Sequence, residues 1–121
     1  MRTEIPMRLP SLNEYIYASK ISKGKWNKGN QMKQDTQRDI MPYLKKLGKY
    51  DKPVRINFIW VEPDYRRDLD NVCFAKKFIL DAMVQAGVIT NDNRKHVTGF
   101  TDYFAYEKDK PKVIVEVLEN E

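Results

Sequence analysis

The stretch PVRINFIWVEP (53–63) decides the fold, because it is the clearest β-strand in the chain and prolines bracket it. Apolar side chains occur on both faces of this strand, at Ile56, Phe58 and Trp60 on one and at Ile59 and Val61 on the other. A strand with this pattern is buried on both sides and lies in the interior of a sheet. The sequence therefore predicts a central strand here, with the other elements arranged around it.

One helix and two further strands are predicted after the central strand. The helix spans 71–86 and is stopped by Gly87. Its apolar residues recur at spacings of three and four, so they share one face: Val72, Ala75, Ile79, Ala82 and Ala86. The strands span about 97–106 and 112–118. The turn KDKP (108–111) between them predicts an antiparallel hairpin.

The elements before the central strand complete the predicted fold. The stretch EIPMRLP (4–10) predicts a short edge strand, and the Lys-, Gly-, Asn- and Ser-rich segment 20–30 predicts a mobile loop. Helical spacing runs from 31 to 47, with Pro42 expected to kink or restart the helix and Gly48 expected to end it. The order βαβαββ predicts a single α+β domain over 1–121, with one mixed β-sheet and two main helices.

Composition narrows the class of protein. The chain has 121 residues, which suits one domain, and its 41% apolar content argues against wholesale disorder. Lys and Arg total 22 against 17 acidic residues, and this excess is compatible with binding to nucleic acid. No apolar run approaches the roughly 20 residues of a membrane span, and the first residues lack a signal core. With one cysteine, Cys73, we expect a cytoplasmic protein with no membrane association.

The hexapeptide RRDLDN (66–71) follows the central strand and places Asp68 and Asp70 beside Arg66 and Arg67. Two interpretations are open from the spacing. In one, the carboxylates are helix caps and ion-pair partners of the arginines. In the other, they bind a metal ion that faces a polyanion. A single cap explains one of the two aspartates but not both.

A third carboxylate, Asp92, lies in the loop ITNDNRKHV (89–97) after the predicted helix. A helix over 71–86 is roughly 24 Å long. Asp92 therefore meets the other two aspartates only if the chain returns after Gly87, or if a second subunit supplies it. Carboxylates without nearby His or Cys ligands suit Mg²⁺, with Mn²⁺ as a substitute.

Lys77 shares a stripe of the predicted helix with the second aspartate of the hexapeptide. The stripe has spacings of 4, 3 and 4 and comprises Asp70, Phe74, Lys77 and Asp81. A lysine there either holds a phosphate near the acids or forms only a solvent-exposed i, i+4 ion pair with Asp81.

Three motifs together resemble the RusA family of Holliday-junction resolvases, which phages and prophages often carry. They are RRDLDN (66–71), the helix end FILDAMVQAGVI (78–89) and NDN (91–93). The resemblance implies a homodimeric, Mg²⁺-dependent endodeoxyribonuclease that resolves four-way DNA junctions by paired symmetric nicks in recombination and repair. It also implies that Asp68, Asp70 and Asp92 hold the metal and act in catalysis together with Lys77.

The position that matches the family's lysine depends on the end of the helix from which one counts, because the helix is about three residues longer here than in the best-known members. Counting back from Asp81 places the lysine on Lys77, whereas counting forward from Asp70 places it on Phe74, which cannot act. Lys76 is the fallback. The expected DNA contacts combine this lysine, the two motif arginines and the acid-free basic segment: Arg66, Arg67, Lys20, Lys23, Lys25, Lys28 and Lys76.

Two other functions fit the same residues. In the first alternative, the chain is a non-catalytic module that binds branched DNA, and its acids serve as caps and ion pairs. In the second, it is a metal-dependent nuclease that acts on flaps or other branched DNA.

Overall fold

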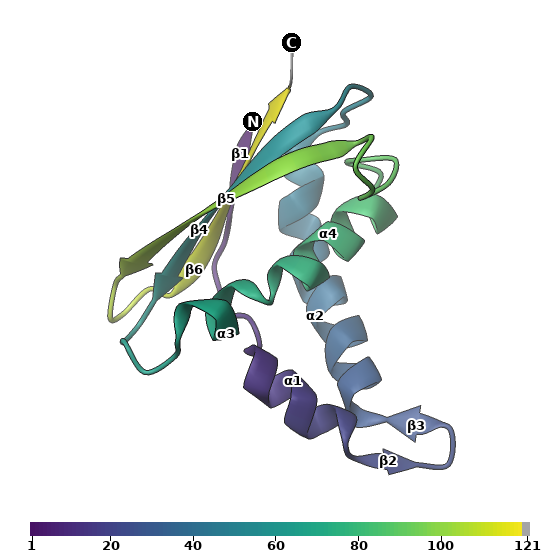
Figure 1. Cartoon of the computed structure of the whole chain (residues 1–121), viewed down its shortest axis with the longest axis vertical. Helices are drawn as coiled ribbons and strands as arrows, with labels where there is room; N and C mark the ends of the chain where they lie inside the picture. Colours follow the sequence, from purple (N-terminus) through teal and green to yellow (C-terminus); the bar gives the residue numbers. More distant parts are fainter. Residues whose placement is uncertain (120–121) are drawn as a thin grey trace.

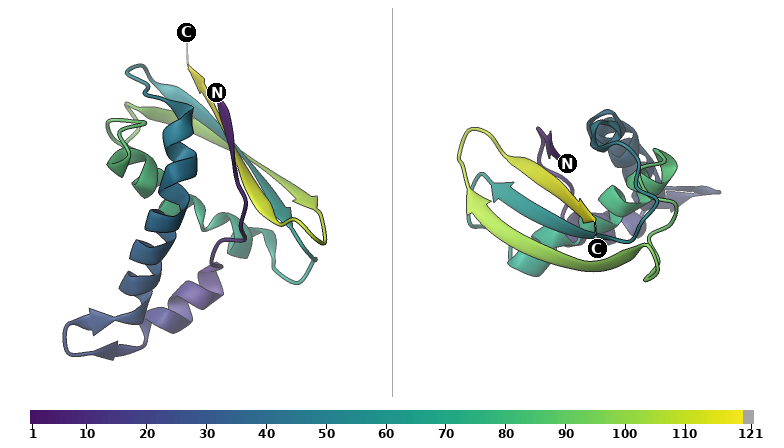
Figure 2. Two further views of the ribbon diagram at one scale, coloured as in Figure 1. Left: turned by 180° about the vertical axis from the view of Figure 1, so that it is seen from behind. Right: turned by 90° about the horizontal axis from the view of Figure 1, so that it is seen from above.

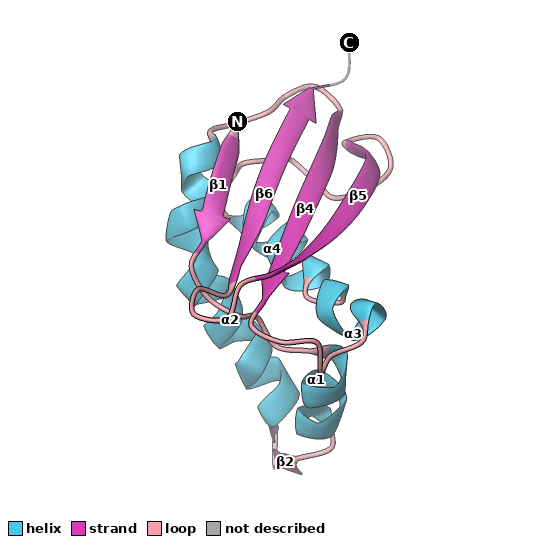
Figure 3. Ribbon diagram, turned by 90° about the vertical axis from the view of Figure 1, so that its left-hand side faces the viewer, coloured by secondary structure: helices cyan, strands magenta, loops and turns pink. Residues whose placement is uncertain are grey.

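Strand β4 (Val54–Glu62) lies inside a mixed sheet, as its two-faced apolar pattern predicted. The computed structural model describes residues 1–119 and shows a single α+β domain. The sheet has four strands in the order β1-β6-β4-β5, which Figure 3 shows face on. The other three strands are β1 (Arg2–Ile5), β5 (Val97–Tyr106) and β6 (Lys112–Glu119).

The predicted hairpin of the last two strands is wrong. β4 lies between them, paired parallel with β5 and antiparallel with β6. A parallel pair needs a long crossover, and the helical segment between β4 and β5 provides it. The turn after β5 then carries the chain past the end of β4, where the Glu107 amide donates to the Glu62 carbonyl at 2.9 Å. β1 pairs antiparallel with β6, and its predicted edge position is confirmed, although the strand begins and ends earlier than 4–10.

The helices lie on one side of the sheet (Figure 2). They are α1 (Leu12–Ser19), α2 (Lys28–Leu44), α3 (Leu69–Cys73) and α4 (Lys76–Gln85), with a 3₁₀ turn η1 (Lys45–Leu47) after α2. The prediction of two main helices is therefore incomplete, because α1 is an additional helix. Fully buried side chains from the sheet and the helices form one core, among them Phe58, Trp60, Ile40, Phe78, Ile79 and Met83.

The predicted mobile loop over 20–30 is also wrong. It contains a small hairpin, β2 (Ser22–Lys23) with β3 (Trp26–Asn27), and the first turn of α2. Gly24 makes the hairpin turn possible through its positive φ of 60°. The Asn27 side chain accepts a hydrogen bond from the Asn30 amide at 3.1 Å and so caps α2. Figure 1 shows this hairpin at the end of the molecule away from the sheet.

The end of α2 agrees with the sequence pattern at Gly48, whereas the helix continues through Pro42 to Leu44 without restarting. Pro42 lies in the last turn of the helix, and Gly48 follows the 3₁₀ turn with a φ of 81°, a conformation that favours glycine. Within residues 1–119, none of the helices combines the length and the apolar content that a membrane crossing requires.

Candidate functional site

The two aspartates of the hexapeptide lie at the start of α3, beyond the carboxyl end of β4. Asp68 is the N-cap residue, but its side chain makes no capping hydrogen bond. Asp70 lies in the first turn, and both residues are exposed. Within residues 1–119, neither carboxylate forms a hydrogen bond or an ion pair. The interpretation as caps and arginine partners is therefore borne out only in position, since Asp68 is the N-cap residue and Asp70 lies in the first turn but neither side chain has a capping bond or an arginine partner. Both carboxylates keep their lone pairs for a ligand.

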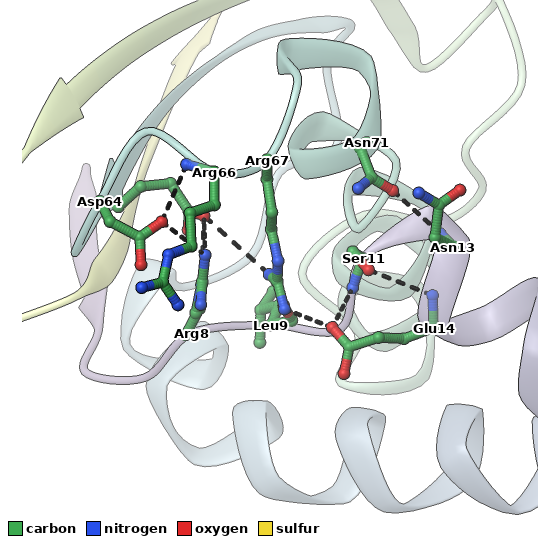
Figure 4. Close-up of polar contacts among 10 residues, drawn as sticks. Arg8, Leu9, Ser11, Asn13, Glu14, Asp64, Arg66, Arg67 and Asn71 are labelled. Atoms are coloured by element: carbon green, nitrogen blue, oxygen red, sulfur yellow. Dashed lines mark hydrogen bonds and ion pairs between the residues drawn. The ribbon is translucent and has the colours of Figure 1, made fainter.

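The neighbouring arginines serve different purposes. Arg67 is largely buried and ties the loop to the segment before α1: its guanidinium donates to the Leu9 carbonyl at 2.9 Å and pairs with Glu14 (Figure 4). Arg66 is exposed, and only its backbone amide is engaged, donating to the Asp64 carboxylate at 3.0 Å. Of the two motif arginines that we expected to contact DNA, Arg66 thus has a free guanidinium within the described chain, whereas Arg67 holds the loop.

The loop that carries Asp68 is held against the rest of the molecule by further polar contacts. Arg8 pairs with Glu62 at 2.9 Å and lies 3.6 Å from Asp64. The Asn71 side chain accepts a hydrogen bond from the Asn13 amide at 2.9 Å, which joins the start of α3 to α1 (Figure 4). These contacts fix the backbone of the motif and leave its two aspartates unpaired.

A pocket of about 350 Å³ lies beside Asp68. The end of β5 and the start of α3 contribute Phe104, Ala105, Tyr106, Leu69 and Val72 to its lining. Tyr65 stacks on Tyr106 at its rim, with ring centroids 4.8 Å apart. Our sequence analysis missed these aromatic residues, because the signal lay in two segments that only the fold brings together.

The predicted continuous helix over 71–86 is interrupted. α3 ends at Cys73 and α4 begins at Lys76, with Phe74 and Ala75 between them. Phe74 and Phe78 each pack against Tyr15 of α1, with centroids 5.4 and 5.8 Å apart. The regular stripe that placed Asp70 and Lys77 on one helix face is therefore wrong, since the break separates the two residues.

Lys77 binds two carboxylates. Its Nζ lies 3.1 Å from Asp81 and 3.6 Å from Asp92. The hydrogen bond to Asp81 is the main reason that the pKa of Lys77 is raised above its usual 10.5. The predicted i, i+4 pair with Asp81 is confirmed, and Lys77 carries a positive charge at neutral pH. Asp81 also pairs with Lys33 of α2 at 3.0 Å, which anchors this cluster to a second helix.

Lys76 faces a different environment from Lys77. Its Nζ pairs with Asp102 of β5 at 2.7 Å and lies over the ring of Phe100 at 4.8 Å. Trp60 donates its indole N–H to the same aspartate at 2.9 Å. The structure thus places Lys76 in a half-buried network and not on an open surface for DNA. Sequence analysis missed Asp102, whose signal was a carboxylate at a helix-facing position of strand 97–106.

Asp92 does not join Asp68 and Asp70 in one chain. The chain does return after Gly87, since the Tyr50 amide donates to the Val88 carbonyl at 2.8 Å, and this return brings Asp92 to Lys77. Within residues 1–119, however, no group of three or more His, Cys, Asp or Glu side chains is placed to hold a metal ion. Of the two sequence alternatives for Asp92, supply by a second subunit stays open.

The basic segment is a free cationic surface. The four expected DNA-binding lysines just after α1, in the hairpin and at the start of α2 are exposed and form no ion pair within residues 1–119: Lys20, Lys23, Lys25 and Lys28. Trp26 lies among them and is 45% exposed.

Cys73, which lies beside the aspartates, is a poor nucleophile, because burial raises the pKa of its thiol.

Known proteins add no identification. No protein-family model matches the chain, and no curated protein sequence matches it. The similarity to the RusA family therefore rests on the three motifs at 66–71, 78–89 and 91–93.

Proposed function

We propose that this protein is a cytoplasmic, homodimeric, Mg²⁺-dependent endodeoxyribonuclease of the RusA type that resolves four-way DNA junctions in recombination and repair. The observation that carries the proposal is the pair of unpartnered carboxylates, Asp68 and Asp70, on a loop whose other charged side chains are paired or basic. Such carboxylates have no hydrogen-bond or ion-pair partner in the described fold, and a bound ligand would supply one.

The donor set suits a magnesium ion. Mg²⁺ in phosphoryl sites is commonly held by one or two carboxylates, with water and substrate phosphate as the remaining ligands. Asp68 and Asp70 offer such oxygens, and Asp68 lines a pocket. When bound, the ion lowers the pKa of a coordinated water and offsets the negative charge that develops on the phosphate.

The chain's own residues would contribute position and charge. The exposed lysines of the hairpin region attract the phosphates of a DNA arm, and Arg66 adds an exposed positive charge on the loop of Asp68. Lys77 would add a fixed positive charge near the phosphate, since its ion pairs with Asp81 and Asp92 keep it protonated. A dimer with a two-fold axis would present two equivalent sites to the two equivalent strands of a junction.

A cleavage assay tests the proposal. Synthetic four-way junction, flap and linear duplex are incubated with Mg²⁺, with Mn²⁺ and with a chelator, and the products are mapped at nucleotide resolution. We expect paired symmetric nicks in the junction that require the metal. If the protein cuts flaps and leaves four-way junctions intact, its substrate is another branched DNA and not the junction. The absence of three clustered acids in one chain, within residues 1–119, favours a second candidate, a non-catalytic binder of branched DNA, which would bind the junction and cut nothing.

A further inference from the structure

We infer that a pocket between the β2–β3 hairpin and α2 binds an unpaired nucleobase of a DNA strand, with the ring of Trp26 as its stacking surface. The inference rests on the proposed function only in taking DNA as the partner, and it involves neither the carboxylates of α3 nor cleavage. It adds a second binding site beside the hairpin, which Figure 1 shows at the end of the molecule away from the sheet.

The pocket has a volume of about 380 Å³, and one face of α2 forms most of its lining. The lining residues of α2 recur at helical spacing and include Lys28, Gln31, Met32 and Thr36. Trp26 of β3 completes the lining and is 45% exposed. An exposed aromatic ring offers a surface for the flat face of a base, because every base has a π-face on which an aromatic side chain can stack.

The backbone around Trp26 is held in place before any ligand binds. Trp26 pairs with Lys23 across the hairpin. The next residue, Asn27, donates from its side chain to the Ser19 carbonyl at 2.9 Å and accepts from the Asn30 amide at 3.1 Å. These bonds join the hairpin to the end of α1 and to the start of α2. A stacking surface that the fold has already positioned loses little freedom on binding.

The charges around the ring favour a nucleic-acid strand over a protein surface. Lys23 lies opposite Trp26 in the hairpin, Lys25 precedes it and Lys28 lines the pocket. None of the three lysines forms an ion pair within residues 1–119. Lysine is depleted from protein–protein interfaces. Aromatic rings among unpaired cations are typical of proteins that bind single strands, where cations contact phosphates and rings contact bases.

The polar groups of the pocket suit the edge of an unpaired base. Thr36 is only 8% exposed, yet its hydroxyl forms no hydrogen bond within residues 1–119. The Gln31 side chain donates to the Asp35 carboxylate at 2.9 Å, which leaves its amide oxygen as an acceptor. These acceptors match the exocyclic amino group of adenine, guanine or cytosine, which thymine lacks. In a duplex that amino group is paired and both faces of the base are stacked, so the pocket selects an unpaired base.

DNA with a single-stranded tail tests the pocket. The tail carries 2-aminopurine, a base with an exocyclic amino group whose fluorescence falls when it stacks, and the protein is titrated in the presence of a chelator. We expect the wild type to quench this fluorescence. Trp26→Ala should abolish the quenching and raise the Kd about tenfold, the scale of stacking on one base. The salt dependence of binding should stay the same, because the phosphate contacts remain.

Two further variants serve as controls for Trp26→Ala. Trp26→Phe keeps an aromatic ring and should retain most of the quenching. Tyr17→Ala removes another exposed aromatic ring, 68% exposed on α1 and outside the pocket lining, and should bind the tail as the wild type does.

Thr36→Val tests the contact with the edge of the base. The substitution preserves the shape of the side chain and removes its hydroxyl. We expect the Kd for a tail of adenines to rise about fivefold, the usual effect of losing one hydrogen bond. The Kd for a tail of thymines should not change. An equal effect on both tails would overturn the assignment of the pocket to an amino-bearing base.

The measurements in chelator separate the pocket from the proposed nuclease. Quenching that depends on Trp26, in a protein that cuts no junction with Mg²⁺, would overturn the nuclease and keep the pocket. Metal-dependent cleavage, together with equal tail affinity and quenching for the wild type and Trp26→Ala, would overturn the pocket and keep the nuclease. An equal loss of affinity for blunt duplex and for tailed DNA would also overturn the pocket, because the ring would then contact paired DNA.

Discussion

The two ends of β5 differ in how they treat their carboxylates. At its carboxyl end, Asp68 and Asp70 are exposed and have no partner within residues 1–119. Near its amino end, Asp92 lies 3.6 Å from Lys77, which also binds Asp81. An acid with a cationic partner contributes to the charge balance of the fold, whereas an acid without one is available to a ligand. The carboxyl end therefore offers carboxylates that are available to a ligand, whereas the amino end holds a lysine that is paired with two carboxylates.

Asp70→Asn should have the largest effect and should act on chemistry alone. We expect the rate of junction cleavage to fall by roughly 10³-fold or more, because the metal's Lewis-acid and water-activating roles are lost. Junction affinity should stay the same or increase, since a negative charge near phosphate is removed. The free energy of unfolding should change by less than about 1 kcal/mol, the usual value of an acid in a first helical turn.

The control for this substitution is Asp51→Asn, at the other end of β4. Asp51 is also exposed and has no partner within the described residues. The Asp51→Asn substitution should leave the rate of junction cleavage unchanged. Rates come from single-turnover assays on a labelled junction, and stability comes from urea titration. A rate for Asp70→Asn near that of the wild type would remove this aspartate from the site.

Lys77→Met tests the positive charge at the amino end. We expect cleavage at saturating junction to fall by about 10²-fold, the scale expected when one electrostatic interaction with a transition state is removed. The fold should persist, because the Lys77 side chain is 57% exposed and the core does not use it. The matched control is Lys49→Met, an exposed lysine without a partner within the described chain, and it should cut normally.

The pH dependence of this lysine has a definite sign. The hydrogen bond to Asp81 raises the pKa of Lys77 above 10.5, so the folded state binds its proton more tightly than the unfolded state does. The stabilising contribution of Lys77 is therefore fully present below pH 10.5 and is lost as the pH rises through the folded-state pKa. The pH–rate profile should show no loss assigned to Lys77 between pH 6 and about pH 10. A loss in that interval that Lys77→Met abolishes would contradict the assignment.

Sequence patterns predicted the sheet better than its connections. The strand 54–62 was recognisable because apolar residues occur on both of its faces, and β5 has the bounds that were predicted for it. The pairing of β5 and β6 was mispredicted because the composition of the turn between them does not reveal that β4 lies between the two strands in the sheet. The hairpin at 22–27 was missed because polar, glycine-rich segments form loops and short hairpins alike.

The sequence offered candidate site residues but not their arrangement. The motif at 66–71 and the loop at 89–97 suggested Asp68, Asp70 and Asp92 as candidates, yet whether they cluster depends on where α4 ends and β5 begins. The helix break at Phe74 and Ala75 has no proline or glycine to mark it. It occurs where Phe74 packs against Tyr15 and Lys76 binds Asp102, and both are contacts between segments distant in sequence.

Replacing Lys20, Lys23, Lys25 and Lys28 with Ala should weaken binding without changing the chemistry. Their exposed side chains have no partner within residues 1–119. The β2–β3 hairpin lies away from α3 (Figure 1). The log–log slope of affinity against salt should flatten by about 0.9 for each DNA phosphate that a lysine no longer neutralises on a duplex arm. Titrations between 50 and 200 mM salt measure the slope, with Lys45, Lys46, Lys49 and Lys52 replaced together as the charge-matched control. Equal slopes for the two quadruple variants would show that the hairpin region does not contact DNA.

Lys76→Met should have the smallest effect on cleavage, and it distinguishes the role of Lys76 from that of Lys77. The Lys76 and Asp102 side chains are only 18% and 24% exposed, so the loss of one partner leaves a poorly solvated charge. We expect destabilisation by about 1–2 kcal/mol, below the cost for a fully buried pair, and a cleavage rate within about threefold of the wild type. The double variant Lys76→Met/Asp102→Asn should lose less stability than the sum of the two single variants, because it removes the unpaired charge. Chemical denaturation and single-turnover cleavage are measured on the same preparations. A large loss of rate for Lys76→Met with normal stability would exchange the roles of the two lysines.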